Sequence, residues 1–224
     1  MAHGLQSARF STTVAKASQL PRSSLPEVAF AGRSNSGKSS AINKLCRRNR
    51  LAFASKTPGR TQALNFFAIG PDEQPDGYLV DTPGYGYAAV PLAVKHGWQH
   101  LAGWYLRNRP CLQGVVLMID CRRTLTAMDI DLLQWMPEGI PRLLLITKAD
   151  KLGRMAQQKT LDIIQQQYMQ SVPALAASFL LFSSSSGQGV EQARSLIESW
   201  FEPADDDPLD DGQTAPDAPA PPNP

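Results

Sequence analysis

The stretch GRSNSGKS has the residue types and spacing of a phosphate-binding loop, G-x-x-x-x-G-K-[ST]. It consists of Gly32, Arg33, Ser34, Asn35, Ser36, Gly37, Lys38 and Ser39. Glycines let the backbone wrap around phosphate oxygens, which the N–H groups at the start of the following helix can bind. We expect Lys38 to reach the β- and γ-phosphates of a nucleotide, and the Ser39 hydroxyl to ligate Mg²⁺.

A second motif, DTPG, can sense the γ-phosphate and its metal ion. It ends the apolar run GYLVDT and consists of Asp81, Thr82, Pro83 and Gly84. The Asp81 carboxylate can hold Mg²⁺ through a water molecule, and the Gly84 N–H can donate to the γ-phosphate. D-x-x-G is a common pattern, but its place at a strand end, 43 residues beyond Lys38, makes it informative.

A third motif, TKAD, indicates the base. It ends the run RLLLITK and consists of Thr147, Lys148, Ala149 and Asp150. Guanine presents N1–H and its 2-amino group side by side, and one carboxylate accepts from both, whereas adenine offers no such pair. Asp150 therefore predicts GTP and GDP rather than ATP, because a site built on such bonds rejects the wrong base. The Lys148 stem is expected over the ring face.

Two loops complete the predicted nucleotide site. The serine-rich turn FSSSSG follows the last apolar run, and the backbone N–H groups of Ser183 and Ser184 can face guanine O6. In the loop SKTPGRTQALNFF, a threonine is expected to coordinate Mg²⁺ only when the γ-phosphate is present. Thr57 and Thr61 both qualify by their distance along the chain, and the physical argument does not choose between them.

Strands and helices alternate along the chain, which predicts how these motifs come together. Continuous apolar runs are typical of strands that are covered on both faces. Strands are expected at 27–32, 63–70, 77–82, 114–120, 142–148 and 177–183, and helices near 37–47, 91–107, 126–136, 154–171 and 189–201. This order predicts a three-layer α/β domain with a mostly parallel six-stranded sheet. All motifs then meet at the carboxyl ends of the strands, where such folds bind ligands.

The charge distribution divides the chain into a basic body and an acidic tail. From Pro203 onward there are six aspartates and no lysine or arginine, so residues 1–202 keep a net charge of +8. A basic body favours a polyanionic partner such as RNA, although charge alone fits a solvated surface equally well. Among the aromatic residues, Tyr85 and Tyr87 lie in a glycine-rich loop and are the candidates for stacking on RNA bases.

The two ends of the chain differ from its body. We expect a single domain over 1–202, in which 1–24 is a partly ordered extension, and a disordered proline-rich tail over 203–224. The serine- and arginine-containing N-terminus weakly resembles an organellar transit segment, which stays open as an alternative. No apolar run approaches the roughly 18–20 residues that cross a bilayer. Three cysteines without C-x-x-C spacing fit a reducing compartment.

Together these motifs resemble the EngB (YihA/YsxC) family of ribosome-biogenesis GTPases, over roughly residues 10–201. The shared segments include AFAGRSNSGKSS, KTPGRTQ, DTPGYGYA and TKADKL. The resemblance implies that Thr61 is the magnesium threonine and that FSS, Phe182–Ser184, is the base-contacting turn. It extends the nucleotide site to Gly59, Arg60, Gln62 and Ala63. The chain departs from the family at Ser36, usually valine, and in its acidic tail, to which no function carries over.

The resemblance also implies a biological role. It implies a cytoplasmic bacterial protein that acts on the large ribosomal subunit or its precursor, through rRNA and ribosomal proteins, and whose loss impairs cell division. Neither DNA nor a membrane is an expected partner, and a monomer is expected. A scaffold that GTP merely stabilises is the alternative, and a nucleotide kinase is a remote third, since TKAD and DTPG argue against it.

Tyr85 raises a question about catalysis, because many GTPases carry a glutamine there that orients the attacking water. Lys38, Mg²⁺ and the loop amides, including the Gly84 N–H, can neutralise charge, but a slow intrinsic rate is expected. A partner can supply the missing group in trans. Alternatively, Asn35 can coordinate a potassium ion, as in relatives within the TrmE–Era–EngA–septin group that carry asparagine at this loop position.

Overall fold

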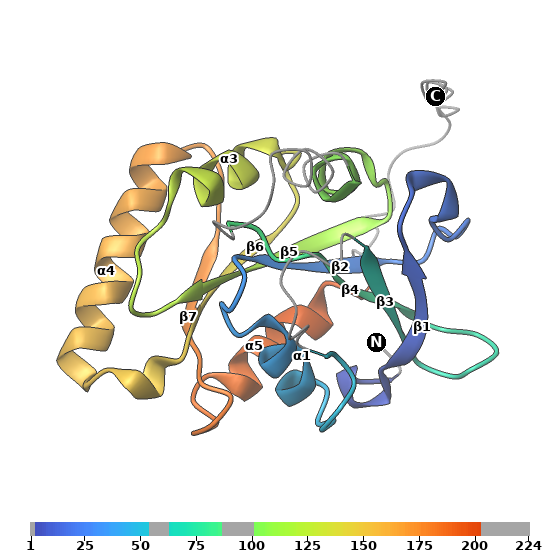
Figure 1. Ribbon diagram of the computed structural model, residues 1–224, viewed down its shortest axis with the longest axis horizontal. Helices are drawn as coiled ribbons and strands as arrows, with labels where there is room; N and C mark the ends of the chain where they lie inside the picture. Colours follow the sequence, from blue (N-terminus) through green and yellow to red (C-terminus); the bar gives the residue numbers. More distant parts are fainter. Residues whose placement is uncertain (1–2, 54–62, 87–100, 203–224) are drawn as a thin grey trace, which may run out of the picture.

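The computed structural model describes residues 3–53, 63–86 and 101–202, and these form a seven-stranded sheet covered by helices (Figure 1). The strand order is β1-β3-β4-β2-β5-β6-β7. The strands are β1 (Arg9–Val14), β2 (Glu27–Gly32), β3 (Leu64–Ile69), β4 (Gly77–Asp81), β5 (Leu112–Asp120), β6 (Arg142–Thr147) and β7 (Ser178–Leu181). Strands β4, β2, β5, β6 and β7 run parallel, whereas β3 is antiparallel to both β1 and β4. The predicted mostly parallel α/β architecture is confirmed.

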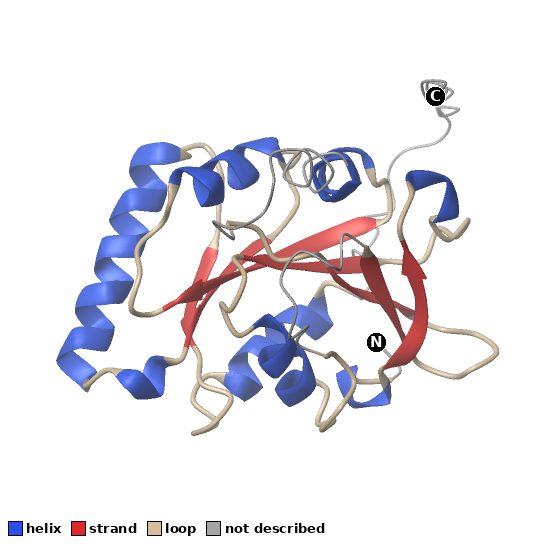
Figure 2. Cartoon of the chain, viewed as in Figure 1, coloured by secondary structure: helices blue, strands red, loops and turns tan. Residues whose placement is uncertain are grey.

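The helices lie on both faces of the sheet (Figure 2). Helices α1 (Lys38–Leu45) and α5 (Val190–Ser199) share one apolar cluster with one face of the sheet. Helix α3 (Ala127–Trp135), helix α4 (Arg154–Ser171) and the helical residues 101–108 share the other cluster. This arrangement explains the continuous apolar runs, because every residue of β2 and of β6 is buried.

The sheet has one strand more than the sequence predicted. The additional strand, β1, forms one edge and is hydrogen-bonded only to β3 among the described strands. Its sequence RFSTTV contains no continuous apolar run, and only Val14 is fully buried. An edge strand with one open face lacks the pattern by which buried strands are recognised, so it was predicted as part of an N-terminal extension.

The predicted helices match the structure where it describes them. Helix α4 has the predicted bounds, and α1, α3 and α5 lie within their predicted ranges. Of the predicted helix 91–107, residues 91–100 lie outside the described residues, whereas Leu101 and Tyr105 are described and buried. The tail 203–224 also lies outside them. Among the described residues, none of the helices has the length and hydrophobicity that a bilayer crossing requires.

A buried ion pair ties the start of β2 to the end of the 101–108 helix. The Glu27 side chain is fully buried, and Arg109 donates to it from Nε (3.0 Å) and Nη2 (2.5 Å). Tyr105 donates its hydroxyl to the same carboxylate at 2.8 Å. Arg109 Nη2 also donates to the Pro21 carbonyl at 2.9 Å. The pair thus fixes the connection that leads from β1 into the central strand.

The first and last elements of the described fold are in contact. The backbone N–H of Leu5, in the short 3₁₀ helix η1 (Leu5–Ser7), donates to Glu198 Oε1 on α5 at 2.8 Å. Leu5 is fully buried in the same apolar cluster as Ile197 and Phe201. The N-terminal segment is therefore anchored in the core.

Candidate functional site

The phosphate-binding loop connects the buried strand β2 to α1, as its sequence pattern requires. Gly37, immediately before α1, has φ +95°, a left-handed conformation that glycine adopts without strain. Asn35 also has a positive φ of +65°, which asparagine tolerates better than most residues. Two left-handed residues so close together turn the loop sharply back on itself before the helix begins. The N-terminus of α1 therefore opens into the curve of the loop, where an anion can bind.

The DTPG motif packs directly against this loop. Ser34 N–H donates to the Tyr85 carbonyl at 2.8 Å, and Tyr85 N–H donates to the Gly32 carbonyl at 3.3 Å. A Cβ at Gly84 would lie 3.0 Å from Ser34 Cα, so only glycine allows this approach without displacement. The two predicted phosphate-binding motifs are therefore held side by side by backbone contacts.

Lys38 and Asp81 form an ion pair at the centre of this arrangement. Both side chains are almost buried, with 11% and 7% of their surface exposed. The Ser39 hydroxyl and the Asp81 carboxylate are oxygen donors of the kind that Mg²⁺ prefers. Nearby, the Ser36 hydroxyl is buried and has no hydrogen-bond partner among the described residues. Polar groups of both signs thus fit a phosphate with its magnesium ion.

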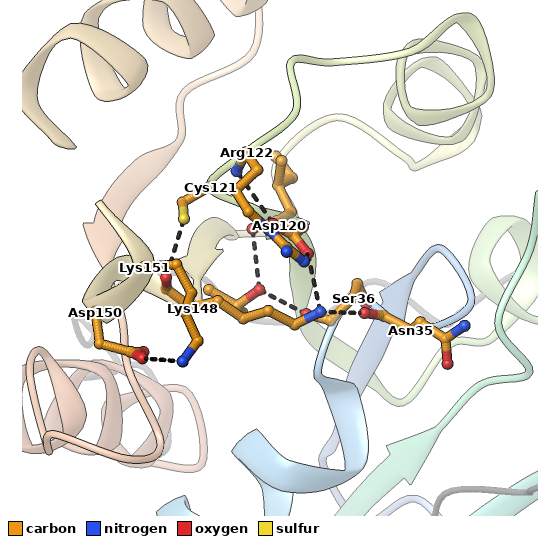
Figure 3. A network of polar contacts seen from close by, with 10 residues as sticks. Asn35, Ser36, Asp120, Cys121, Arg122, Lys148, Asp150 and Lys151 are labelled. Carbon is orange, nitrogen blue, oxygen red and sulfur yellow. Dashed lines mark hydrogen bonds and ion pairs between the residues drawn. The ribbon is translucent and has the colours of Figure 1, made fainter. Parts of the chain in front are cut away.

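The TKAD motif contacts the phosphate-binding loop at Asn35 and Ser36 (Figure 3). Lys148 Nζ donates to the Asn35 carbonyl at 2.7 Å and to Asp120 Oδ2 at 2.9 Å. Thr147 Oγ1 donates to the Ser36 carbonyl at 2.5 Å. The structure therefore brings the base motif and the phosphate motif into direct contact, whereas the Asn35 side chain points away from this network.

Asp120, at the end of β5, is a member of this network that sequence reasoning missed. It is buried, and Arg122 donates to its two carboxylate oxygens from Nε (2.9 Å) and Nη2 (2.7 Å). These hydrogen bonds, followed by that from Lys148, hold the pKa of Asp120 well below its usual range. A carboxylate that ends the apolar run GVVLMID at the same sheet edge was the available signal.

Replacing Asp120 by asparagine is expected to destabilise the protein by about 1–3 kcal/mol at pH 7, because charged hydrogen bonds to Arg122 and Lys148 are lost. A depressed carboxyl pKa stabilises the fold fully above the ordinary value of 3.8 and progressively less as the pH falls below it. The difference from the wild type in urea unfolding should therefore shrink toward about pH 3. Asp131→Asn, at an exposed position of α3, is the control; an equal loss there would contradict the assignment.

The predicted base residue lies beside the predicted base turn. Ser183 Oγ donates to Asp150 Oδ1 at 2.6 Å, and Lys151 Nζ lies 3.2 Å from Asp150 Oδ2. The Ser183 hydrogen bond is the main reason why the pKa of Asp150 is lowered, which keeps the carboxylate ionised. Ala149 N–H donates to the Phe182 carbonyl at 3.1 Å, so the two loops are joined. The Phe182 ring itself is buried, which leaves backbone atoms for a base.

Some predicted site residues are not placed. Gly59, Arg60, Thr61 and Gln62, as well as Thr57, lie outside the described residues. Ala63 is described and nearly buried at the entry to β3. The structure therefore assembles the phosphate loop, DTPG, TKAD and the FSS turn at the carboxyl edge of the sheet, and the magnesium threonine stays a prediction.

The prediction that Tyr85 is a stacking platform for RNA is wrong. Tyr85 is 3% exposed, and its hydroxyl donates to Asp129 Oδ1 on α3 at 2.5 Å. Burial, followed by the Asp129 charge, raises the pKa of Tyr85 well above its ordinary value. The loop sequence gave no sign of an acceptor supplied by a helix 44 residues away. Tyr87 lies outside the described residues.

Sequence comparisons match the chain along most of its length. The family described as "50S ribosome-binding GTPase" matches residues 27–148. A probable GTP-binding protein EngB of Burkholderia pseudomallei (strain K96243) is 50% identical over 212 residues, which cover 91% of this chain and 95% of the relative. The corresponding protein of Paraburkholderia phytofirmans is 46% identical, with 93% and 98% covered.

Solved structures show the same fold. A crystal structure of a probable GTP-binding protein engB superposes with a TM-score of 0.56 at 19% identity, covering 78% of this chain and 98% of the other. Era in complex with MgGDPNP and nucleotides 1506–1542 of 16S ribosomal RNA gives a TM-score of 0.61 at 20% identity, covering 84% and 59%.

Proposed function

Because the chain belongs to the EngB family of GTP-binding proteins, within the 50S ribosome-binding GTPases, we propose that it is a GTP-controlled switch in the assembly of the large ribosomal subunit. The GTP form binds a precursor particle through rRNA and ribosomal proteins, and hydrolysis releases the protein. The proposal places it in the cytoplasm as a monomer of one GTPase domain, 1–202, with an acidic tail, 203–224. By family resemblance it also includes a role in cell division and septation.

One observation carries the nucleotide part of this proposal: the contact of Lys148 and Thr147 with the carbonyl groups of Asn35 and Ser36. This contact fixes Asp150, which would pair with guanine, relative to Lys38, which would pair with the phosphates. A ligand that reaches both residues needs a guanine at one end and a polyphosphate at the other. GTP and GDP meet this requirement.

The residues present can perform hydrolysis in stated roles. Lys38 leaves Asp81 for the β- and γ-phosphates, and the freed Asp81 carboxylate accepts a hydrogen bond from a water molecule. The Gly84 N–H donates to the γ-phosphate, while Ser39 and Thr61 would hold Mg²⁺. Mg²⁺, when bound, would supply positive charge that offsets the negative charge of the phosphate oxygens. The Tyr85 hydroxyl is bonded to Asp129, so the attacking water must be oriented by another group.

We propose a potassium ion held by Asn35 as one source of the missing charge. Potassium chloride should raise GTP turnover about tenfold over sodium chloride at equal ionic strength, equivalent to about 1.4 kcal/mol of transition-state stabilisation. Asn35→Gly removes the side chain but keeps the positive φ accessible, so it should abolish the difference. Asn108→Ala, at an exposed position, is the control. Equal rates in both salts, with and without ribosomal subunits, would count against the ion.

Sedimentation of the purified protein with ribosomal subunits tests the proposed function. A non-hydrolysable GTP analogue should bring the protein down with the large subunit, whereas GDP should leave it in the supernatant. Co-sedimentation that ignores the nucleotide would contradict a switch. Ser39→Ala and Thr61→Ala separate the switch from a scaffold stabilised by GTP, because a scaffold supports assembly without a magnesium-dependent change.

A further inference from the structure

A groove beyond the C-terminal end of α1 has side chains of a kind that the nucleotide site does not use. Its volume is about 700 Å³, and it is lined by β1, β3 and the turn that follows α1. The residues that give it its character are Arg48, Arg50, Phe10 and Phe53. We propose that this basic groove, defined by these four residues, binds single-stranded RNA. The inference deepens the proposed function, on which it rests, by naming the surface for rRNA.

The charge of the basic groove suits phosphate groups. Arg48 and Arg50 are exposed, and neither forms an ion pair with any acidic residue in the described part of the chain. Arg9 also lines the groove, but its guanidinium is held by Asp72 and by two backbone carbonyls. No acidic residue is found among those that line the groove. Two guanidinium groups are thus left to bind a polyanion.

The aromatic side chains of the basic groove suit unpaired bases. Phe53 is 74% exposed and Phe10 is 57% exposed, and these are two of the five large apolar side chains that the described surface exposes. Phe10 is supported from below by an edge-to-face contact with Phe67, with ring centroids 6.3 Å apart. Single-stranded nucleic acid stacks its bases on such rings while arginines contact its backbone, whereas a duplex keeps its bases inside.

The turn that carries the arginines is preorganised. The Asn43 side chain accepts from the N–H groups of Leu51 (2.9 Å) and Ala52 (2.8 Å), and it donates to the Ala52 carbonyl at 2.8 Å. Buried Arg194 donates to the Leu45 carbonyl at 2.8 Å at the other end of the turn. A partner therefore does not have to order this backbone when it binds.

Fluorescence anisotropy tests the proposal with the full chain and a labelled single-stranded RNA of mixed sequence, about 12 nucleotides long. Arg48→Ala/Arg50→Ala should weaken binding about 25-fold at 0.1 M salt and reduce the salt slope by about 1.4, the release expected for two phosphates. Phe53→Ala should weaken binding about 5- to 150-fold and leave the salt slope unchanged. A nonspecific basic surface would show the loss of affinity and of salt dependence in the arginine variant, but it would not show the loss of affinity in Phe53→Ala.

Matched controls lie on α4, away from the basic groove. Arg154→Ala/Lys159→Ala removes the same charge, and Met155→Ala removes an apolar side chain that is 90% exposed. Both controls should bind RNA like the wild type. The proposal is overturned if the groove variants do so too, if Phe53→Ala has no effect, or if the same RNA binds as tightly after annealing to its complement.

Two further measurements separate this inference from others. The groove variants should bind a fluorescent GDP as tightly as the wild type does. If the wild type itself did not bind GDP, the proposed function would be refuted, but the RNA-binding measurements would still test the groove. Sedimentation velocity without RNA tests a second copy of the chain as the occupant. A dimer that Phe53→Ala disrupts would assign the groove to that copy and overturn the RNA proposal.

Discussion

Replacing Asp150 by asparagine is expected to weaken GTP binding by about 10²- to 10⁴-fold, because two hydrogen bonds to a charged carboxylate are replaced by one neutral hydrogen bond and a donor–donor contact. Ser183 and Lys151 hold the carboxylate in place and ionised, so both of its oxygens are acceptors. An asparagine keeps one acceptor and turns its NH₂ group toward a guanine donor. The same NH₂ group can donate to the 2-carbonyl of xanthine, so xanthosine triphosphate should bind the variant more tightly than the wild type.

Titration with fluorescent, non-hydrolysable analogues of GTP and xanthosine triphosphate measures both changes in the same protein. Asp162→Asn, on the exposed side of α4, removes an equal charge and should leave both affinities as they are. Undiminished GTP affinity in Asp150→Asn would overturn the assignment of the base site. A fall in GTP affinity without any gain for the xanthine nucleotide would show that the substitution had disrupted the structure of the loop around Asp150 and had not changed its base specificity.

Replacing Arg109 by alanine is expected to destabilise the fold by about 3–5 kcal/mol, since it leaves the Glu27 carboxylate buried without its ion-pair partner. This is a large part of the roughly 5–15 kcal/mol that holds a typical domain together. The midpoint of thermal unfolding should fall by about 6–20 °C. Urea unfolding at neutral pH gives the free energy directly.

A second variant distinguishes the lost charge pair from lost packing. Glu27→Gln/Arg109→Ala removes the uncompensated charge, while the glutamine still accepts from the Tyr105 hydroxyl. The double variant should therefore be more stable than Arg109→Ala alone, which double-mutant analysis expresses as a coupling energy. If both variants unfold at the same urea concentration, burial of the Glu27 charge is not the cause.

The parallel strands and the motifs at their ends could be predicted from the sequence for one physical reason. Strands that are covered on both faces have continuous apolar sequences, so they can be recognised. The residue that ends each such run lies at the carboxyl edge of the sheet, where ligands bind. The sequence alone therefore predicts that Asp81 and Thr147 lie at the same edge of the sheet. At these residues the local sequence pattern is enough to predict the position in the fold.

Other features depend on partners that no local pattern reveals. Strand β1 requires β3, which lies about fifty residues further along the chain, as its only described neighbour. Tyr85 is buried because α3 presents Asp129 as an acceptor, and Asp120 matters because Arg122 and Lys148 converge on it. The run RRNR, 47–50, indicates a binding surface only once the fold brings Phe10, from the distant edge strand, into the same groove.

The hydrogen bond between Leu5 and Glu198 indicates that the protein can be circularly permuted. Since both ends of the described fold meet in one apolar cluster, a short linker can join them. New ends could then be opened in the connection 172–177, between α4 and β7. Such a circular permutant should fold and bind guanine nucleotides, because its contacts are those of the native chain read from another starting point.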